Sequence, residues 1–478
     1  MGTRNYNGGN GADRLHAGHA THKSIISGGG GNDDLNAGHT TWESWIYAGD
    51  GNDVIGNYNK ALNQIYIWDG AGDDYVNVGA VNVNIYASSG NDTYHVTSGS
   101  NVYIELGEGE KDVTVNYVSS QATLVEQGTW YDRDINVSSA NTTITTGMGN
   151  DTIYAFGLFS CNVESWGGNN NISAQGAGVS IRTGSGHDTL TSSAVSSFVH
   201  SGDGDDWIIA KGVSATVHTG WNGNNYVYAG GAHAEVWTGN GHDEIDACGI
   251  YANIRSEGGD DLIQVNAVGA TVNAGSGNND LYIRAAGSNV TAGNGNDYAY
   301  VGAAVGLVDL GHGNNTVDYH AIGGTVRVGN GNDRVNVRAV GIGMDVGEGN
   351  NHIDVRAAGA NITAGNGNDY AYVGAAVGLL NLGHGHNTVD FHAIGGEVRV
   401  GNGNDRINVR AVGVNIDAQG GHNHIDVRAG GARITAGDGN DYAYVGAGVG
   451  CWISGMATTT LCFMLREVMF TLVTAMIE

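Results

Sequence analysis

The 478-residue chain contains no proline but 82 glycines. Proline would remove a backbone donor from a strand that is paired on both sides, so its absence fits a chain made of stacked, paired strands. Glycine supplies tight turns with positive φ. The two extremes together are typical of an array of short strands joined by glycine turns.

Basic residues are also scarce, because 20 Lys and Arg stand against 48 Asp and Glu, for a formal net charge of −28. The chain has no basic patch that could neutralise phosphates, so nucleic acid is not an expected partner. One interpretation of the acidity is a solvated acidic face. The other is a polyanion whose carboxylates need cations in order to lie close together.

Cysteines and long apolar runs are few. Of the four cysteines, Cys161 and Cys248 should lie about five turns apart, roughly 24 Å at ~4.8 Å per stacked strand, which excludes a disulfide between them. The N-terminal segment MGTRNYNGGNGADRLHAG has no apolar core, so no secretory signal peptide is visible. The C-terminal segment is apolar, but Arg466 and Glu467 interrupt it, so we expect no membrane span.

The dominant feature of the sequence is a repeat. From Gly275 to Gly437 a glycine-rich acidic loop recurs every 18 residues, as in GNGNDRVNVRAVGIGMDV at 329–346. Residues 293–364 and 365–436 align without gaps and differ at 15 of 72 positions, so four turns were copied as a block. Repeats of this kind build solenoids in which each unit contacts its neighbours.

Within a unit, the residues alternate as in a strand. Val335 and Val337 alternate with Arg334, Asn336 and Arg338, which predicts an inward aliphatic set and an outward polar set. A second short strand is predicted near Met344 and Val346. We therefore predict an all-β fold, a parallel β-roll or β-solenoid of about 24 turns with two strands per turn.

The regularity of the repeat divides the chain into three parts. Residues 1–146, where loop spacing loosens to about 18 to 21, are predicted to be irregular, cap-like turns, although a separate fused module is an alternative. Residues 147–450 are predicted to be the regular β-roll. Turn starts need not be glycine, and the register places one at Gln419.

Residues 451–478 lose the pattern, and we interpret them as a frameshifted tail outside the native fold. When each codon is read one base earlier, 452–459 can encode L/V-D-L-G-H-G-N-N, which matches VDLGHGNN at 308–315. Residues 473–478 can likewise encode another GNGND loop. The recovered loops begin at 455 and 473, which keeps the 18-residue register and places the shift near Val449–Gly450.

The loops resemble the nonapeptide G-G-x-G-x-D-x-U-x of the hemolysin-type calcium-binding (RTX) repeats. In one unit Gly329, Gly331, Asp333 and Val335 fill the second glycine, the third glycine, the aspartate and the aliphatic position, while Val328 replaces the first glycine. In RTX proteins calcium lies between neighbouring loops, held by carboxylates and backbone carbonyls. The resemblance therefore implies Ca2+ as the cofactor.

Carried over position by position, the resemblance assigns the metal to the aspartate that closes each loop. These residues are Asp13, Asp33, Asp53, Asp74, Asp92, Asp151, Asp188, Asp206, Asp243, Asp261, Asp297, Asp333, Asp369, Asp405 and Asp441.

The chain departs from the RTX pattern in two ways. The second half of each unit, such as 337–345, has lost the motif, so one edge only should bind calcium. Asparagine also replaces aspartate in many turns, in strict alternation from Asp297 onward, and fewer ligand charges mean weaker binding. The alternative is an Asn/Asp ladder of hydrogen bonds that needs no metal.

The resemblance implies an extracellular, calcium-binding repeat protein that serves as a spacer, adhesin or surface-layer segment, exported by a C-terminal signal missing from this chain. Calcium is the expected partner, and cell-surface polysaccharide or other surface proteins are further candidates. The array offers no single non-repeated catalytic constellation, so we expect no enzymatic activity. The alternatives are an ice-binding solenoid with an Asn rank at Asn296, Asn332 and Asn368, or the repeat module of a polysaccharide-modifying enzyme.

Other recurring residues have less specific interpretations. Histidines such as His320 and His352 are interpreted as solvated surface residues in preference to zinc ligands. The pair Tyr298 and Tyr300 could stack on sugars, but plain sheet-surface aromatics are favoured. We also expect Asp354 to lie beside Arg338 on the neighbouring turn and to give cross-strand support.

Overall fold

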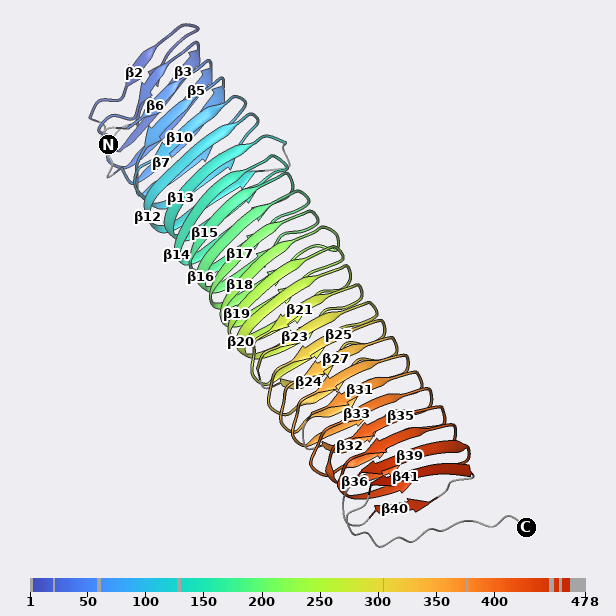
Figure 1. Ribbon diagram of the computed structural model, residues 1–478. Helices are drawn as coiled ribbons and strands as arrows, with labels where there is room; N and C mark the ends of the chain where they lie inside the picture. The colour runs from blue at the N-terminus through green and yellow to red at the C-terminus, as the bar shows by residue number, and fades with distance from the viewer. Residues whose placement is uncertain are drawn as a thin grey trace. The chain divides into compact units, whose positions relative to one another are not determined.

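The computed structural model describes residues 3–19, 22–57, 62–126, 130–303, 305–374, 377–446, 451–454 and 458–464. All regular elements in these ranges are β-strands, and their parallel pairing forms a β-solenoid of about 24 turns, which confirms the predicted fold class (Figure 1). No helix among the described residues is long and apolar enough to cross a membrane. The chain divides into two compact units, Met1–Gly239 and Asn240–Glu478, which are described separately.

The first unit begins with turns that contain two short strands each. One parallel ladder joins β1, β3, β5, β7, β9 and β11, and the other joins β2, β4, β6, β8 and β10. The bounds are β1 Thr3–Asn7, β2 Arg14–His16, β3 Lys23–Gly30, β4 Asp34–Asn36, β5 Glu43–Asp50, β6 Val54–Gly56, β7 Gln64–Ala71, β8 Tyr75–Val78, β9 Asn82–Tyr86, β10 Asp92–Val96 and β11 Gly99–Leu106.

The remaining turns of the first unit each contain one long strand that bends near its middle. β12 pairs with both β10 and β11, so it carries both ladders in one strand. The bounds are β12 Lys111–Glu126, β13 Arg133–Thr146, β14 Thr152–Ser165, β15 Asn171–Arg182, β16 Thr189–His200, β17 Trp207–His218 and β18 Tyr226–Trp237. In these turns the two predicted strands run together, because residues such as Gly176 keep the bend hydrogen-bonded to its neighbours.

The core of each turn lies between its two arms. In β15 the inward residues Ile172 and Ala174 on one arm face Val179 and Ile181 on the other, and all four are buried. The intervening residues point outward and are partly or fully exposed. Burial of such aliphatic side chains contributes about 25 cal/mol per Å² of apolar surface removed from water, repeated at each turn.

The second unit begins with two long strands, β19 Glu244–Arg255 and β20 Leu262–Asn273, and then returns to two strands per turn. The following strands are β21 Asp280–Ile283, β22 Ser288–Thr291, β23 Tyr298–Val301, β24 Val305–Asp309, β25 Thr316–Tyr319, β26 Thr325–Arg327, β27 Arg334–Val337, β28 Gly343–Asp345, β29 His352–Val355, β30 Ala360–Thr363, β31 Tyr370–Val373, β32 Val377–Asn381, β33 Thr388–Phe391, β34 Glu397–Arg399, β35 Arg406–Val409, β36 Val412–Asp417, β37 His424–Val427, β38 Gly430–Thr435 and β39 Asn440–Gly446.

The predicted alternation is confirmed in the Gly329 turn. Val335 and Val337 are buried in β27, whereas Arg334 and Arg338 are exposed. β28 is the predicted second strand near Met344. The predicted turn start at Gln419 has φ of 49°, which is the left-handed conformation that glycine adopts at equivalent positions, such as Gly329 at 66°.

Two further strands follow β39. The backbone of β40 Cys451–Ser454 pairs with β38, and that of β41 Thr458–Met464 pairs with β39, with Asn440 opposite Thr458. The proposed shift point at Val449–Gly450 and the loop starts at 455 and 473 lie outside the described residues. The boundaries at 146 and 450 remain predictions. Cys161 and Cys248 are not joined to each other by a disulfide, as expected.

Candidate cation-binding loops

The glycine loops of successive turns are in direct contact. Gly349 has φ of 120°, and a Cβ atom added to it would lie 1.9 Å from the carbonyl oxygen of Gly331 in the preceding loop. That distance is shorter than any real contact, so only glycine fits there. Loops that lie this close bring many carbonyl oxygens together along one edge of each unit.

The predicted aspartates do not point into solvent but into this stack. Except for Asp13, which is half-buried, each has at most 3% of its surface exposed. In most turns the backbone N–H of the residue in this position donates to Oδ1 of its counterpart in the following turn, as from Asp333 to Asn351 at 3.0 Å. We call this row of buried Asp and Asn side chains the inner ladder.

The inner ladder brings the predicted residues together in three described runs. Its consecutive members are Asp13, Asp33, Asp53, Asp74 and Asp92 in the first run, Asp151, Asn170, Asp188, Asp206 and Asn225 in the second, and Asp243, Asp261, Asn279, Asp297, Asn315, Asp333, Asn351, Asp369, Asn387, Asp405, Asn423 and Asp441 in the third.

A second row of side chains, which is exposed, runs beside the inner ladder, and its hydrogen bonds run in the opposite direction along the chain. The backbone N–H of Asn332 donates to Oδ1 of Asn314 in the preceding turn at 2.8 Å, and Asn350 donates in the same way to Asn332. Histidine can replace asparagine here, because Nδ1 of His386 accepts from the N–H of Asn404 at 2.9 Å. This outer ladder and the inner ladder together connect each loop to both of its neighbours.

The inner ladder uses only one oxygen of each aspartate. The second oxygen is buried and has no hydrogen-bond donor among the described residues in many turns. These atoms are Oδ2 of Asp33, Asp53, Asp74, Asp188, Asp206, Asp261, Asp297, Asp333, Asp369, Asp405 and Asp441, and Oδ1 of Asp151. A buried carboxylate oxygen without a partner is costly, so these atoms need a proton or a cation. Beside Asp206 and Asp261 a hydroxyl, of Ser201 and Ser256, meets part of this need.

The electrostatics agree with this requirement. Burial raises the pKa of Asp297 to about 6 and that of Asp333 to about 7, above the ordinary value of 3.8, although hydrogen bonds from Asn279 and Asn315 oppose the shift. The pKa of Asp74 rises to about 8, first because of burial and then because Asp69, Asp92 and Asp53 are close by. The charged form is therefore destabilised where nothing compensates it.

The asparagine turns show which kind of group the loop interior accepts. In Asn351 the amide Nδ2 occupies the place of the second aspartate oxygen, and it donates to the carbonyl oxygens of Gly347 at 3.4 Å and Gly349 at 3.1 Å. The equivalent Nδ2 of Asn387 donates to Gly383 and Gly385. The loop carbonyls therefore face a positive partner in asparagine turns, whereas in aspartate turns they face another oxygen.

One turn carries a cation of its own at this point. Lys111 occupies the aspartate position, opposite Asp92 and Arg133 on the flanking turns through β10, β12 and β13, and its side chain is fully buried. Its Nζ donates to the carbonyl oxygens of Gly90 and Glu108, both at 2.6 Å, and lies 2.5 Å from Oδ2 of Asp92. Two successive loops and an aspartate thus enclose one positive charge.

 In the Cα register of these strands Lys111 is paired directly with Asp92 and with Arg133, so all three belong to the same row.

Arg133 repeats this arrangement one turn later. Its guanidinium is fully buried and donates to the carbonyl oxygens of Gly109 and Gly107, the latter at 2.9 Å. It also forms a two-point contact with the carboxylate of Glu126, with Nε to Oε2 at 3.0 Å and Nη2 to Oε1 at 2.8 Å. In two neighbouring turns the row of buried aspartates is thus continued by buried cations.

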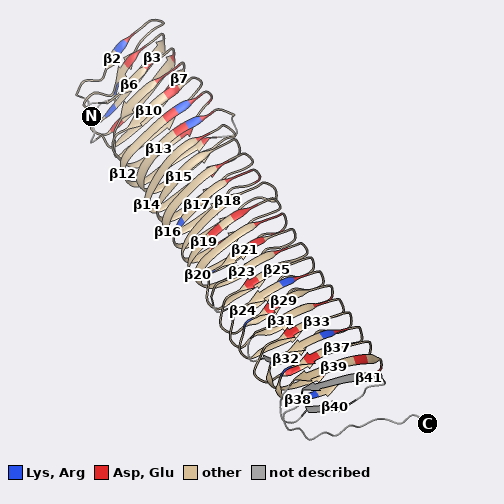
Figure 2. Ribbon diagram, in the orientation of Figure 1, with Lys and Arg blue, Asp and Glu red and all other residues tan. Residues whose placement is uncertain are grey.

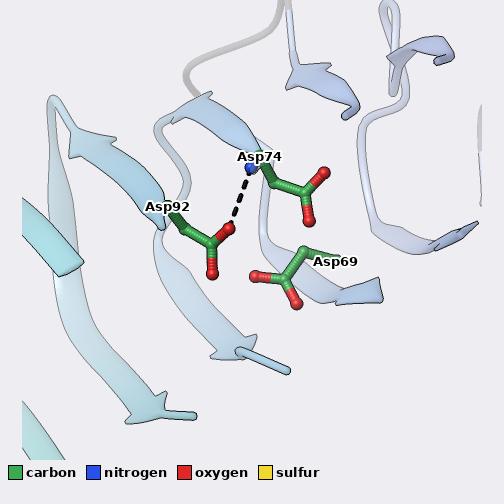
Figure 3. A group of neighbouring side chains, drawn as sticks. All are labelled: Asp69, Asp74 and Asp92. Atoms are coloured by element: carbon green, nitrogen blue, oxygen red, sulfur yellow. Dashed lines mark hydrogen bonds between the residues drawn. The ribbon is translucent and has the colours of Figure 1, made fainter. Parts of the chain in front are cut away.

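A further acidic residue joins the row in the first unit. Asp69, at the end of β7, converges with Asp74 and Asp92, and their carboxylate oxygens lie within 4.8 Å of one another (Figure 3). The hydroxyl of Tyr94 lies 2.5 Å from Oδ2 of Asp69 and 2.9 Å from Oδ2 of Asp92. Burial is the main cause that raises the pKa of Asp69 to about 6. This cluster has the oxygen ligands that a hard divalent cation prefers.

The sequence pattern did not identify Asp69, Lys111, Glu126 or Arg133. The sequence contained a sign of each of these residues, because each is a charged residue at a position where the neighbouring turns have a buried residue. Asp69 is in register with Ala48 and Ala87, and Lys111 and Arg133 replace the loop aspartate. The loose spacing of the early loops concealed this register.

Comparison with protein-family models, curated protein sequences and solved structures finds no match to this chain. The fold and the loops therefore define its class by themselves. It is a parallel β-solenoid repeat protein with one edge of stacked glycine loops and buried carboxylates.

Proposed function

We propose that this chain is an extracellular, RTX-like β-roll that binds calcium between its glycine loops and acts as a structural or adhesive segment. The observation that carries the proposal is Lys111. Its ammonium shows that two stacked loops and one aspartate can enclose a cation, with oxygen contacts at 2.5 to 2.6 Å. Calcium prefers such sets of carboxylate and carbonyl oxygens.

The unpartnered aspartate oxygens support the same proposal for the other turns. They would hold the ion together with carbonyl oxygens of the adjoining loops. In the cluster of Asp69, Asp74 and Asp92, the ammonium of Lys111 already contacts Asp92. Bound calcium would supply positive charge that neutralises the buried row. The aspartates keep their Oδ1 atoms on backbone N–H groups, so the residues themselves hold each carboxylate in a fixed orientation.

The alternation of Asp and Asn supports an extracellular setting. In the second unit each ladder aspartate from Asp297 to Asp405 has asparagine on both flanking turns, so a site between two loops contains one ladder carboxylate. Few ligand charges correspond to weak binding, in the range of about 10⁻⁴–10⁻³ M that is typical of extracellular calcium modules. Such sites would fill where calcium is millimolar, outside the cell.

The ice-binding alternative is less well supported. The Asn rank at Asn296, Asn332 and Asn368 belongs to the outer ladder, where its side-chain oxygens accept from the next turn's backbone. His386 interrupts this row in the following turn. The second alternative, the repeat module of a polysaccharide-modifying enzyme, would use the same calcium-binding fold.

The proposal is tested by calcium titration of the full chain after treatment with chelator. Circular dichroism should report a gain of β-structure and calorimetry should report bound calcium, at concentrations where magnesium has no comparable effect, because magnesium requires tighter octahedral geometry. A chain that is fully folded in chelator and binds no calcium would show that the inner ladder is complete with protons and amides alone.

A further inference from the structure

The second unit has two equivalent pockets on the sheet face formed by the first strand of each turn. One is lined by residues of β25, β27 and β29, and the other by the corresponding residues of β33, β35 and β37, with cavity volumes of about 280 and 260 Å³. Each contains three arginines, among them Arg334 and Arg338 in the first pocket and Arg406 and Arg410 in the second. Lys and Arg are otherwise sparse in the chain (Figure 2).

The acidic groups of the first pocket are already engaged. Asp318 accepts from Nδ2 of Asn336 at 2.7 Å and from the hydroxyl of Tyr298 at 3.1 Å. Asp354 pairs at 3.3 Å with Arg356, which directly follows β29 on the same turn, and this corrects the expectation that Arg338 is its partner. Within the described residues, Arg334 and Arg338 have no carboxylate within ion-pair distance.

The second pocket reproduces this arrangement 72 residues later. Asp390 accepts from Asn408 at 2.9 Å and from Tyr370 at 3.0 Å, and Asp426 pairs with Arg428 at 3.5 Å. Arg406 and Arg410 are exposed and again lack a carboxylate partner among the described residues. Each pocket therefore offers two free guanidinium groups in a chain whose formal net charge is −28.

Free guanidinium groups in a pocket select anions, because their planar donor fork matches a carboxylate or sulfate. Aromatic rings lie on the turns beside the first pocket: Tyr370 of β31 stacks on His352 of β29 at 4.9 Å, and the pocket residue Arg356 lies over the ring of Tyr372 at 5.6 Å. The half-buried rings and the oriented carboxylates provide apolar faces and hydroxyl acceptors of the kind that contact sugar rings. The combination favours an anionic sugar over a simple inorganic ion.

The repetition indicates a polymer. The two pockets are separated by four turns, roughly 19 Å at ~4.8 Å per stacked strand. A linear chain with the same anionic group at regular intervals could occupy both pockets, and its second contact would be intramolecular. Nucleic acid also carries regular charge, and the net charge of −28 repels any polyanion, but the repulsion is stronger for duplex DNA, which carries about one charge per 1.7 Å, than for a polysaccharide with one carboxylate per disaccharide.

We propose that the two pockets are binding subsites for an acidic polysaccharide, whose carboxylate groups contact Arg334 and Arg338 in one pocket and Arg406 and Arg410 in the other. This names the partner for the adhesive role proposed above. It depends on the folded sheet and not on the calcium loops, which lie at the edge of the turn. The pockets can therefore be tested whether or not calcium is needed for folding.

The test measures binding of hyaluronate, a linear polymer with one carboxylate per disaccharide, to the full chain in saturating calcium and ~0.15 M salt. Removing one pocket with Arg334→Gln and Arg338→Gln should weaken the affinity for long hyaluronate at least about tenfold, because avidity is lost. Removing both pockets, by adding Arg406→Gln and Arg410→Gln, should abolish binding. Circular dichroism and calcium affinity should be unchanged in both variants.

The matched control is Arg327→Gln with Arg433→Gln. These exposed arginines lie on β26 and β38, which are second strands of their turns, and the control removes the same charge as the one-pocket variant. It should change the affinity less than about threefold. An equal loss in control and pocket variants would overturn the proposal, because it would mean that binding follows net charge.

Further ligands complete the test. Neutral dextran should not bind, and hyaluronate oligomers too short to span four turns should bind the wild type and the one-pocket variant with similar affinity. Chondroitin sulfate separates the sources of the anion: sulfates that add no affinity over hyaluronate would assign the pockets to carboxylates. Polyphosphate or single-stranded DNA that binds as tightly as hyaluronate, or hyaluronate that does not bind a folded chain, would refute the acidic-polysaccharide assignment.

Discussion

The backbone N–H of Asn351 donates to Oδ1 of Asp369 at 2.8 Å, while the N–H of Asp369 donates to Oδ1 of Asn387 at 3.0 Å. The two residue types are therefore interchangeable as acceptors in the inner ladder. They differ at the second atom, where Asn351 has a donor for the loop carbonyls and Asp369 has an oxygen without a partner. This difference separates the two roles of the row, which are cohesion of the loops and binding of a cation.

The first prediction concerns that difference. Replacing Asp333, Asp369 and Asp405 with Asn should stabilise the chain in chelator, because each new Nδ2 can donate to carbonyls that now face an oxygen. The same variant should bind fewer calcium ions by calorimetry. The matched control is Asp345→Asn, an exposed position on β28, which should change neither quantity. A variant that binds calcium as the wild type does would place the ion elsewhere.

The second prediction concerns pH. Burial holds the pKa of Asp297 near 6 and those of Asp206 and Asp333 near 7, above the 3.8 of an ordinary aspartate. Without calcium, the folded chain therefore retains protons that the unfolded chain has lost between about pH 4 and pH 7. Its stability should be highest at mildly acidic pH and should fall as pH rises through this window.

Thermal unfolding in chelator between about pH 4.5 and 8 measures this dependence. Saturating calcium should remove most of it, because the cation replaces the proton, and calcium affinity should rise with pH over the same window. A metal-free stability that rises with pH across this range would contradict the assigned burial of uncompensated carboxyl groups.

The third prediction concerns Lys111. In Lys111→Asp the internal ammonium is replaced by the residue found in neighbouring turns, so the variant should lose stability in chelator and recover it in calcium. It should also bind at least one more calcium ion than the wild type. Lys211→Asp, which changes an exposed lysine on β17, is the matched control and should gain no ion. Loss of structure that calcium cannot restore would count against an equivalent role of the two cations.

The fourth prediction concerns loop contact. Gly349→Ala should destabilise its turn by at least about 2 kcal/mol, because a Cβ would overlap the Gly331 carbonyl and φ is positive. Gly430→Ala adds a Cβ with no atom within 4 Å and should stay within about 0.5 kcal/mol of wild type. Hydrogen exchange of the Gly331 and Gly349 loops measures the difference, since damage in a repeat array concentrates in neighbouring turns. Equal protection in the two variants would mean that the loops can separate without cost.

The sequence predicted the fold well because its information is local and repeated. The alternation around Val335, the second strand near Met344 and the turn start at Gln419 each follow from the 18-residue period and the two-residue period of a strand. The joining of two strands into one in β12 to β20 was not predicted, since it depends on how the bends of neighbouring turns pair.

The candidate site was predicted in part. The pattern located the aspartate row, but it could not show that one oxygen of each carboxylate is held by the next turn's backbone, because that contact joins residues 18 or more positions apart. It assigned no role to Lys111 or Arg133. Their role becomes visible only when the carbonyl oxygens around them are placed in space.

The strict alternation of Asp and Asn has a consequence for how such a chain can change its length. Inserting or deleting an odd number of turns would place two aspartate loops, or two asparagine loops, next to each other, whereas an even number preserves the order. The copied block of 72 residues corresponds to four turns and obeys this parity rule. Length variants of this array that remain equally soluble and foldable should therefore differ by multiples of 36 residues, so that the arrangement of buried charge restricts which duplications can persist.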